Sequence, residues 1–490
     1  MRKRFLSLAL LLMLGLSLCV PAQAADVVEL VWYVSQDAVP TDVDNVFGEL
    51  NKYLEEKIGV RVKPFIFRNP DYNEKVPTIV NSGQEFDICF TATWGNKFLP
   101  NVEKGAYLPL DELLPQYAPE TVEAIPDMVW DAARVDGQIY AIPCYKEIGA
   151  QPGIMINKDI ADELGIDLST VKTLADMEPI LALVKEKKPD VIGITGLDFN
   201  LVTASQNLVG SNSLPGTAAV PGFGDFAAQG EGAFNQYETE EFKAFCEMTH
   251  RWYEAGYLPS DPVQYATDNG GRDTDDKAGR LFSWIISYAP NYKNTRALEV
   301  GHGVEYIPLR GGIYAGGGGF QAVSITSKHP EKALEFLNLV NTDKYVGTLI
   351  RHGIEGVHYK SVSDNLIDPY GTGYTAENHP YNLTIGWQFG SVFNQKWVNS
   401  YPEDVVAQYE AYNADAVKAP YMGFTFNAEN VSTEQAAINT VVEQYLSPLM
   451  TGMVDPQTGI PQFLDALKAN GVEKLITEVN AQLDAWKAAR

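Results

Sequence analysis

Strand-like and helix-like segments alternate over residues 29–91, and this constrains the fold more than any other feature of the chain. The predicted order is strand, helix, strand, helix, strand, at residues 29–34, 43–58, 60–67, 72–83 and 86–91. In the first helical segment Val46, Leu50 and Leu54 recur at helical spacing, and Gly59 follows its end. The last strand is wholly apolar, as strands buried in a parallel sheet are. The pattern therefore predicts an α/β fold with helices packed on a largely parallel sheet.

The alternation continues to about residue 340 and then changes character. Further strands are predicted at 138–143, 154–156, 191–195, 280–286, 304–308 and 320–325, and helices at 174–184, 238–255 and 330–340. After a loop-rich, aromatic stretch, three helical segments end the chain, at 432–445, 460–470 and 472–490. A chain of 490 residues is expected to divide into two or three domains.

Residues 1–24 are predicted to be a secretory signal peptide. A basic start, an apolar run from Phe5 to Val20 and the Ala22-x-Ala24 sequence fit such a peptide, with cleavage after Ala24. The run is too short for a lasting transmembrane helix. Lipid attachment at Cys19 is the less favoured alternative, because Leu18 is larger than the residue that usually precedes a lipidated cysteine. We expect an extracytoplasmic protein, in the periplasm or at the cell surface.

Charge and cysteine content narrow the classes of function. The formal net charge is −26, and cleavage also removes the basic residues at positions 2–4. Phosphate contacts need clustered Lys and Arg, so binding to nucleic acid or to an anionic membrane is not expected. Cys89, Cys144 and Cys246 remain, with no Cys-x-x-Cys pair, and we expect buried thiols although an extracytoplasmic location would permit one disulfide.

The sequence carries no common catalytic, nucleotide or metal motif. It has no Gly-x-Ser-x-Gly, His-Glu-x-x-His or Walker sequence. His352 and His358 lack a common zinc spacing, and Asp273-x-Asp275-Asp276 lacks the rest of an EF-hand loop. Gly316–Gly319 precedes a strand, whereas a dinucleotide loop follows one, so a sharp bend or a close approach explains it better. We predict no catalytic residue, no cofactor and no metal. A pair of glycosidase carboxylates has no sequence spacing of its own and stays open.

Several sequence segments, taken in order, resemble those of one protein family. They are Asn81-Ser82-Gly83-Gln84-Glu85-Phe86-Asp87-Ile88, the run Val102 to Leu113 that includes Lys104-Gly105-Ala106-Tyr107-Leu108-Pro109-Leu110, then Asp136-Gly137-Gln138-Ile139-Tyr140-Ala141-Ile142-Pro143, Ser327-Lys328-His329-Pro330-Glu331-Lys332-Ala333, and residues 352–359. They resemble the extracellular solute-binding proteins of family 1, which deliver sugars to ABC importers. Residues 421–426, 451–456 and 484–486 are similar to the C-terminal domain of the LipO-like subgroup. The resemblance covers nearly all of the mature chain.

The resemblance implies a two-lobed periplasmic-binding-protein fold of class II, the Venus-flytrap type, with extra C-terminal helices. It puts lobe one at 26–143 plus 303–350, and lobe two at 147–300 plus 360–490. Hinges are expected near Cys144-Tyr145-Lys146, near Gly301 to Val304 and near His352 to Tyr359. The implied function is capture of an oligosaccharide and its delivery, by a monomer, to the transmembrane subunits of an ABC permease.

Candidate sugar contacts come from strand ends, the first hinge and the aromatic stretch. Aromatic rings stack on the apolar faces of sugars, while Asp, Glu, Asn and Gln pair with their hydroxyls. Ligands of α/β sheets lie beyond the carboxyl ends of the strands. The predicted binding residues are Trp32, Tyr33, Trp94, Tyr145, Glu147, Trp284, Tyr288, Trp387, Gln388 and Asn394. Core packing is the alternative for each aromatic residue.

Two other classes of function stay open at this point. One is a binding protein for a non-sugar solute, such as a peptide, an amino acid or a polyanion. A polyanion would require converging basic residues, and Arg272, Arg280, Lys293 and Arg310 are scattered in the sequence. The other is a secreted glycan hydrolase.

Overall fold

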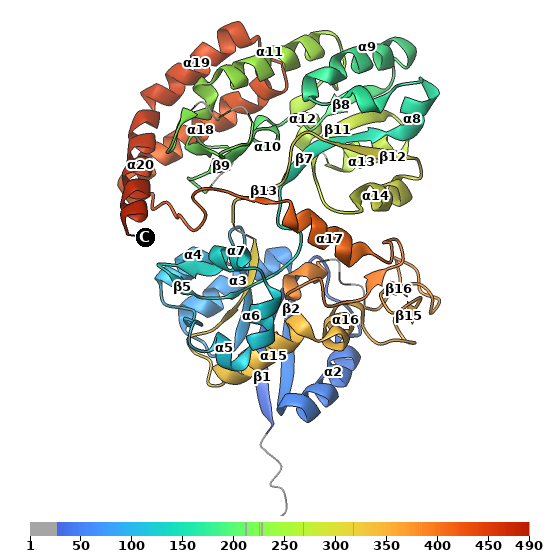
Figure 1. Cartoon of the computed structure of the whole chain (residues 1–490), viewed down its shortest axis with the longest axis vertical. Helices are drawn as coiled ribbons and strands as arrows, with labels where there is room; N and C mark the ends of the chain where they lie inside the picture. Colours follow the sequence, from blue (N-terminus) through green and yellow to red (C-terminus); the bar gives the residue numbers. More distant parts are fainter. Residues whose placement is uncertain are drawn as a thin grey trace, which may run out of the picture.

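The computed structural model describes residues 27–210, 213–224, 226, 229–267, 269–316, 318–381, 383 and 385–489. The predicted signal peptide and Cys19 lie outside these residues. Among the helices of the described part, none has the length and apolarity needed to cross a membrane. The chain forms two α/β lobes, one above the other along the long axis (Figure 1), with further helices at the C-terminal end. The predicted two-lobed architecture is therefore confirmed.

Lobe one is built on a five-stranded sheet of order β2-β1-β3-β14-β6. Its strands are β1 Val28–Gln36, β2 Val60–Arg68, β3 Ile88–Ala92, β14 Gly319–Val323 and β6 Ile142–Pro143. β1 pairs in parallel with β2 and β3, and β14 runs antiparallel to β3. Its principal helices are α2 Val43–Ile58, α3 Asn69–Ser82, α4 Phe98–Glu103, α5 Leu114–Tyr117, α6 Pro119–Ala124, α7 Asp127–Trp130, α15 Pro330–Thr342 and α16 Lys344–His352.

Lobe two is built on a four-stranded sheet of order β12-β7-β11-β8. The strands are β7 Gln151–Asn157, β8 Ile192–Thr195, β11 Leu281–Tyr288 and β12 Val304–Pro308. A small ribbon of β9 Ser205–Asn207 and β10 Thr217–Ala219 lies apart from the sheet. Around them lie α8 Lys158–Glu163, α9 Met177–Lys187, α10 Phe199–Val202, α11 Glu240–Glu254, α12 Pro262–Thr267, α13 Asn269–Lys277 and α14 Tyr292–Val300.

Three C-terminal helices belong to the second lobe. They are α18 Ser432–Met450, α19 Pro456–Ala469 and α20 Val472–Ala488, drawn in red shades beside α11 in Figure 1. Phe463 of α19 packs against Phe242 of α11, with ring centroids 6.4 Å apart, and stacks on Tyr445 of α18 at 5.8 Å. All three helices contribute to the same apolar core as α9 and α11. The extra helices thus extend the core of lobe two.

The predicted lobe boundaries need correction in two places. Residues 304–308 form β12, which pairs with β7 from Val304↔Asn157 to Pro308↔Gly153, so they belong to lobe two. The stretch that follows 360 packs on lobe one instead of lobe two: Phe389 lies 5.4 Å from Trp32, and Tyr381 shares that core. This stretch contains β15 Lys360–Ser361, β16 Leu366–Asp368, the short helix η6 Gly386–Phe389, β17 Trp397–Val398 and α17 Val405–Ala414.

Three segments cross between the lobes side by side. Residues 144–150 form the first, where the sequence placed it. Ala150 bridges to Ile313, and β13 Ile313–Tyr314 pairs in parallel with β18 Val417–Lys418. The second and third crossings therefore lie near 309–314 and 415–420, and not at Gly301 to Val304 or His352 to Tyr359. The latter segment lies inside lobe one, where His352 Nε2 is 3.0 Å from the Lys396 carbonyl.

Candidate functional site

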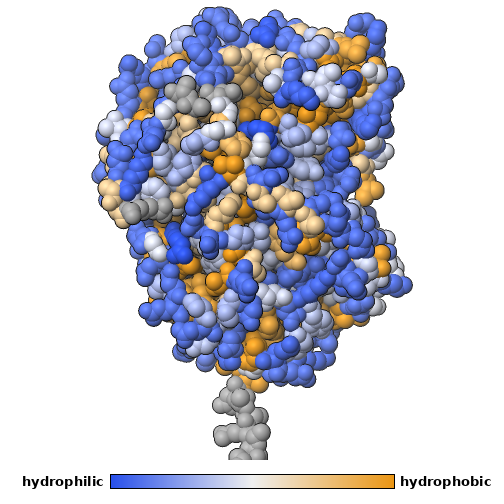
Figure 2. Space-filling model, viewed as in Figure 1, coloured by the Kyte–Doolittle hydropathy of each residue, from blue (hydrophilic) through white to orange (hydrophobic). Residues whose placement is uncertain are grey.

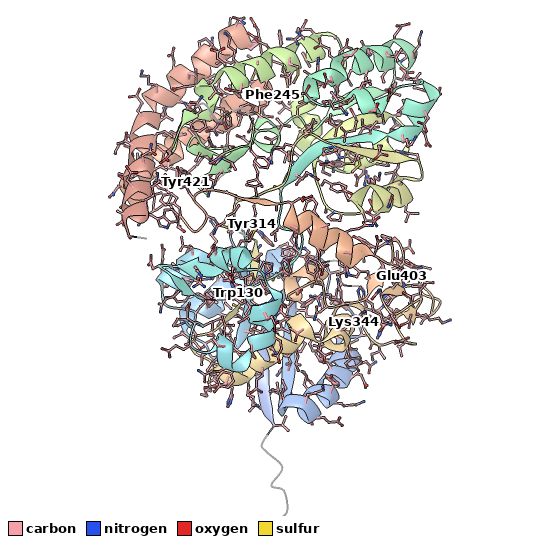
Figure 3. The ribbon with its side chains drawn as sticks, in the orientation of Figure 1. Trp130, Phe245, Tyr314, Lys344, Glu403 and Tyr421 are labelled. Atoms are coloured by element: carbon pink, nitrogen blue, oxygen red, sulfur yellow. The ribbon has the colours of Figure 1, made fainter. Side chains whose placement is uncertain are left out.

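A cleft of about 600 Å³ lies where the crossing segments meet the two lobes. Tyr314, on its wall, lies at this junction in Figure 3. Figure 2 shows orange and pale surface near the same level, among mostly blue surface. Lobe one, the crossing segments and lobe two all supply lining residues, among them Thr93, Pro143, Gly319, Lys146, Glu147, Arg310, Asp198, Asn200 and Thr217.

Strand direction explains why these residues meet. Thr93 follows the carboxyl end of β3, and Gly319 starts the antiparallel strand beside it. In lobe two, β8 runs parallel to β11 and antiparallel to the departing β7, so Asp198 follows its carboxyl end at the cleft. Arg310 follows the carboxyl end of β12 in the same way. Both sheets thus present the edge at which α/β sheets bind ligands.

The lobe-two wall is polar. Asp198 caps α10 by accepting hydrogen bonds from the backbone N–H groups of Asn200 at 2.9 Å and Leu201 at 3.2 Å. Burial raises the pKa of the Asp198 carboxyl, and these two bonds oppose that rise. Arg310 donates to the carbonyls of Ala150, Gly311 and Leu201 at 3.1–3.4 Å. Burial lowers the pKa of Arg310 to about 10.

Three polar atoms of this wall have no hydrogen-bond partner within the described residues. They are Asn200 Oδ1, Thr217 Oγ1 and Arg310 Nε, and each is buried. A buried polar atom without a partner costs about 1–3 kcal/mol, so such atoms are few in folded proteins. All three belong to residues that line the lobe-two side of the cleft, so this side holds unused hydrogen-bonding capacity just beneath its surface.

The lobe-one side carries an aromatic lip. Trp94 is 52% exposed, and its ring centroid lies 6.4 Å from that of Trp387. Lys146 Nζ lies 5.3 Å from the Trp387 ring and forms an ion pair with Glu147. A Cβ atom on Gly319 would lie 2.8 Å from the Trp387 ring, so glycine is required for this close approach. Trp387 therefore lies against two residues that line the cleft, Lys146 and Gly319.

A buried arginine holds the loop that carries Trp387. Arg351 donates to the carbonyls of Gly386 at 2.9 Å, Gly347 at 3.1 Å and Ser391 at 2.8 Å. The side chain is buried, and this burial lowers its pKa to about 10. Arg351 thus ties both ends of η6 to α16 and fixes the position of Trp387.

Of the ten predicted contacts, only Glu147 is among the residues that line the cleft. Trp94 and Trp387 lie beside it, since Trp94 follows the lining residue Thr93 and Trp387 lies against Lys146 and Gly319. Tyr145 begins the first crossing but is buried, stacked on Phe393 at 4.4 Å. Tyr288 ends β11 and stacks on Tyr306 at 4.1 Å, beside the crossings.

The remaining five are enclosed elsewhere and do not line the cleft. Trp32 and Tyr33 are in the lobe-one core, and Trp284 is 2% exposed beneath the Arg296 guanidinium. Gln388 is fully buried, and Asn394 donates to the Val340 carbonyl at 2.7 Å. The residues missed by sequence reasoning are mainly those of lobe two. Asp198 is the N-cap of the four-residue helix α10, Asn200 lies in that helix and Thr217 begins the short strand β10. The position of Asp198 after a predicted strand is the signal that could have found it.

The cysteines and the Asp273–Asp276 segment, considered above for disulfide and calcium chemistry, have structural roles instead. Cys89, Cys144 and Cys246 are buried free thiols, as predicted. Arg296 donates to Asp273 at 2.9 Å and to the fully buried Asp276 at 2.7 Å. Within the described residues no group of three His, Cys, Asp or Glu side chains could hold a metal ion.

The basic residues considered for a polyanion do not converge. Arg310 lines the cleft, whereas Arg280 pairs with Asp275 at 2.6 Å and Lys293 with Glu305 at 2.8 Å, both away from its lining. The cleft lining holds two basic and two acidic side chains, Lys146, Arg310, Glu147 and Asp198. This balance does not favour a polyanion.

Comparison with known proteins gives two family matches. The profile described as "Bacterial extracellular solute-binding protein" matches residues 37–347, and a domain of unknown function, DUF3502, matches residues 420–488. A protein of Streptococcus pneumoniae serotype 4 named "Carbohydrate ABC transporter substrate-binding protein" is 28% identical over 458 residues, covering 91% of this chain and 89% of its own. Lipoprotein LipO of Bacillus subtilis is 22% identical over 385 residues, 74% of each chain.

Among solved structures, the chain is similar to the N-glycan transport solute binding protein NgtS of Streptococcus pneumoniae. The structure named without a ligand matches with a TM-score of 0.80 at 26% identity, covering 94% of this chain and 98% of that one. The complexes with Man1GlcNAc and Man5GlcNAc match with TM-scores of 0.68 and 0.64, at the same identity, and cover 93% and 94% of this chain and 99% and 98% of theirs.

Proposed function

The chain belongs to the bacterial extracellular solute-binding proteins, and on this basis we propose that it captures an oligosaccharide for an ABC importer. In this proposal the mature protein, residues 25–490, works outside the cytoplasm as a monomer. It encloses the sugar between its lobes and hands it to the transmembrane permease. It performs no chemical step on the sugar.

The observation that carries the proposal is a cleft with a polar lobe-two wall and a pair of aromatic rings beside its lobe-one residues. Trp94 and Trp387 offer rings on which the apolar face of a sugar can stack. Asn200, Thr217 and Arg310 are polar residues that line the lobe-two side of the cleft, where sugar hydroxyls need partners. A cleft of about 600 Å³ has room for several sugar residues. This combination suits a neutral oligosaccharide better than a peptide or a polyanion.

The hinge geometry supports capture by closure. Three crossing segments lie side by side through Ala150, Ile313 and Val417, so a small change in each can rotate one lobe relative to the other. The TM-score against NgtS is 0.80 for the structure named without a ligand and falls to 0.68 and 0.64 for the two glycan complexes, while the sequence identity stays at 26%. The aligned share of this chain stays at 93–94%, so the lower TM-scores support a different arrangement of the two lobes in the glycan complexes. A ligand that contacts both lobes only when closed would shift that equilibrium.

The two carboxyl groups of the cleft favour binding over hydrolysis. A glycosidase needs one carboxyl as an acid and another as a nucleophile or base, both facing the glycosidic bond. Glu147 is paired with Lys146, and Asp198 is committed to the N-terminus of α10. Both are therefore held by the protein itself.

Isothermal titration calorimetry of residues 25–490 tests the proposal. The titrants are oligosaccharides of two to six residues, starting with Man1GlcNAc and Man5GlcNAc, and chromatography of each sample detects cleavage products. Saturable binding with an intact glycan is the expected result. Cleaved glycan would replace the proposal with a hydrolase. Binding of peptides or amino acids but of no glycan would assign another class of solute.

A further inference from the structure

A second chamber of about 360 Å³ adjoins the main cleft. The two cavities share five lining residues, Thr93, Asn207, Gly210, Ala315 and Gly316, so they lie side by side. The chamber leads away from the crossing segments, between the lobe-one residues 97–100 and 132–135 and the lobe-two residues 207–210 and 423–426. A ligand longer than the main cleft would extend into it.

The C-terminal domain supplies one wall of this chamber, residues Gly423–Phe426. This segment starts the region that matches the domain of unknown function, residues 420–488. Phe424 and Phe426 are partly exposed and pack on the lobe-two core. The Phe424 ring is supported by Trp486 of α20, with ring centroids 5.9 Å apart. Helix α20 therefore helps to position an aromatic wall.

The segment just before this wall is attached to both lobes. The backbone N–H of Tyr421 donates to Gln206 Oε1 at 2.8 Å, and its hydroxyl accepts from the Gly232 N–H at 3.2 Å, both in lobe two. Met422 packs into the lobe-one core next to Gly316. A Cβ atom added to Gly316 would lie 3.2 Å from the Met422 side chain, so the two residues are in close contact. Figure 3 shows Tyr421 beside the upper lobe and near its lower edge. The aromatic wall is thus fixed in position relative to the cleft.

The opposite side of the chamber offers hydrogen-bond donors. Lys97 is exposed and forms no ion pair within the described residues. Arg134 reaches the chamber from lobe one while contacting Asp111 and the Gly137 carbonyl. Partly exposed rings facing donor groups are the chemistry that a sugar ring needs, a stacking face and partners for hydroxyls.

We propose that the start of the C-terminal domain, through Phe424 and Phe426, forms a distal subsite for the far residues of a long oligosaccharide and so sets the length preference. This rests on the proposed function of the main cleft. A short glycan occupies the main cleft alone and does not reach the subsite. A longer glycan gains an additional aromatic contact there.

Calorimetry on the full mature protein tests the subsite, with Man1GlcNAc as the short probe and Man5GlcNAc as the long one. Phe426→Ala removes one ring of the chamber and should raise the Kd for Man5GlcNAc about tenfold while leaving that for Man1GlcNAc unchanged. Phe65→Ala is the matched control, since Phe65 is 37% exposed on β2 of lobe one, away from both chambers. Hydrogen–deuterium exchange should show protection of residues 423–426 by the long probe only.

The outcomes are distinguishable. Equal loss for both probes, or no loss for either, would overturn the subsite and leave the proposed function standing. Protection of residues 423–426 by Man1GlcNAc would also overturn it. Wild-type protein that binds neither probe would refute the subsite for these glycans and would count separately against the proposed function. Unaltered binding of the short probe to Phe426→Ala shows that the variant is folded.

Discussion

Arg351 is predicted to stabilise the binding site through hydrogen bonds alone, and its replacement gives a specific order of stabilities. The side chain is 2% exposed and donates to the carbonyls of Gly386, Gly347 and Ser391 at 2.8–3.1 Å. Within the described residues no carboxylate forms an ion pair with it, so the cation is compensated by carbonyl dipoles. Arg351→Met removes a donor from three carbonyls; that of Gly347 keeps the backbone N–H of α16, whereas those of Gly386 and Ser391 lose this partner at about 1–3 kcal/mol each, and the substitution also removes a buried charge. We expect a net loss of about 3 kcal/mol.

Arg351→Lys should be at least as destabilising as Arg351→Met. A lysine retains the buried charge, but its single nitrogen cannot span carbonyls from residues 347, 386 and 391 as a guanidinium does. Urea unfolding at pH 7 measures both variants, and Arg61→Met, at an exposed ion pair with Glu55, is the control, with an expected change under about 1 kcal/mol. A lysine variant as stable as wild type would refute the reasoning, because charge and not hydrogen-bond geometry would then be what the site requires.

Three further predictions concern binding, pH and a buried ion pair. Trp94→Ala and Trp387→Ala should each weaken glycan binding about tenfold in calorimetry. Trp284→Ala, at a buried core residue, should lower the melting temperature but leave the affinity unchanged. Loss of affinity in Trp284→Ala alone would contradict the proposed position of the binding site. Burial, with a smaller effect from Arg351, lowers the pKa of His352 to about 4. The unfolded chain therefore binds a proton at higher pH than the folded one. Protonation of His352 should lower the free energy of unfolding by about 2.5 kcal/mol as the pH falls from 6.5 to 4. Urea denaturation at each pH should show no such loss for His352→Gln. Arg296→Leu leaves the fully buried Asp276 without its guanidinium and should cost about 3–5 kcal/mol, while adding Asp276→Asn should restore part of the loss; a double variant no better than the single one would contradict this pairing.

The layered fold could be predicted because its signals are local. The strands and helices from β1 to β3 follow from apolar spacing and from Gly59, which takes a left-handed conformation at the end of α2. The third crossing could not be placed. Residues 360–414 stay on lobe one through long-range contacts, such as Phe389 with Trp32, before the chain crosses near 417, and no local pattern encodes that packing.

The site could be predicted in part, for a similar reason. Trp94 lies after the end of β3 and is exposed there, as the strand-end rule suggests. Trp32 and Trp284 lie inside strands whose two faces are covered, so their rings pack in the cores. The sequence shows which residues end a strand, but the covering of both sheet faces decides which rings remain accessible.

Closure of the lobes around a glycan should change the overall dimensions of the protein, which small-angle X-ray scattering measures. Residues 25–490 would be measured alone and with saturating Man5GlcNAc, and with any other glycan that calorimetry identifies. We expect a smaller radius of gyration in the presence of the bound glycan, because the lobes rotate about the segments through Ala150, Ile313 and Val417. A bound glycan with an unchanged radius of gyration would contradict it.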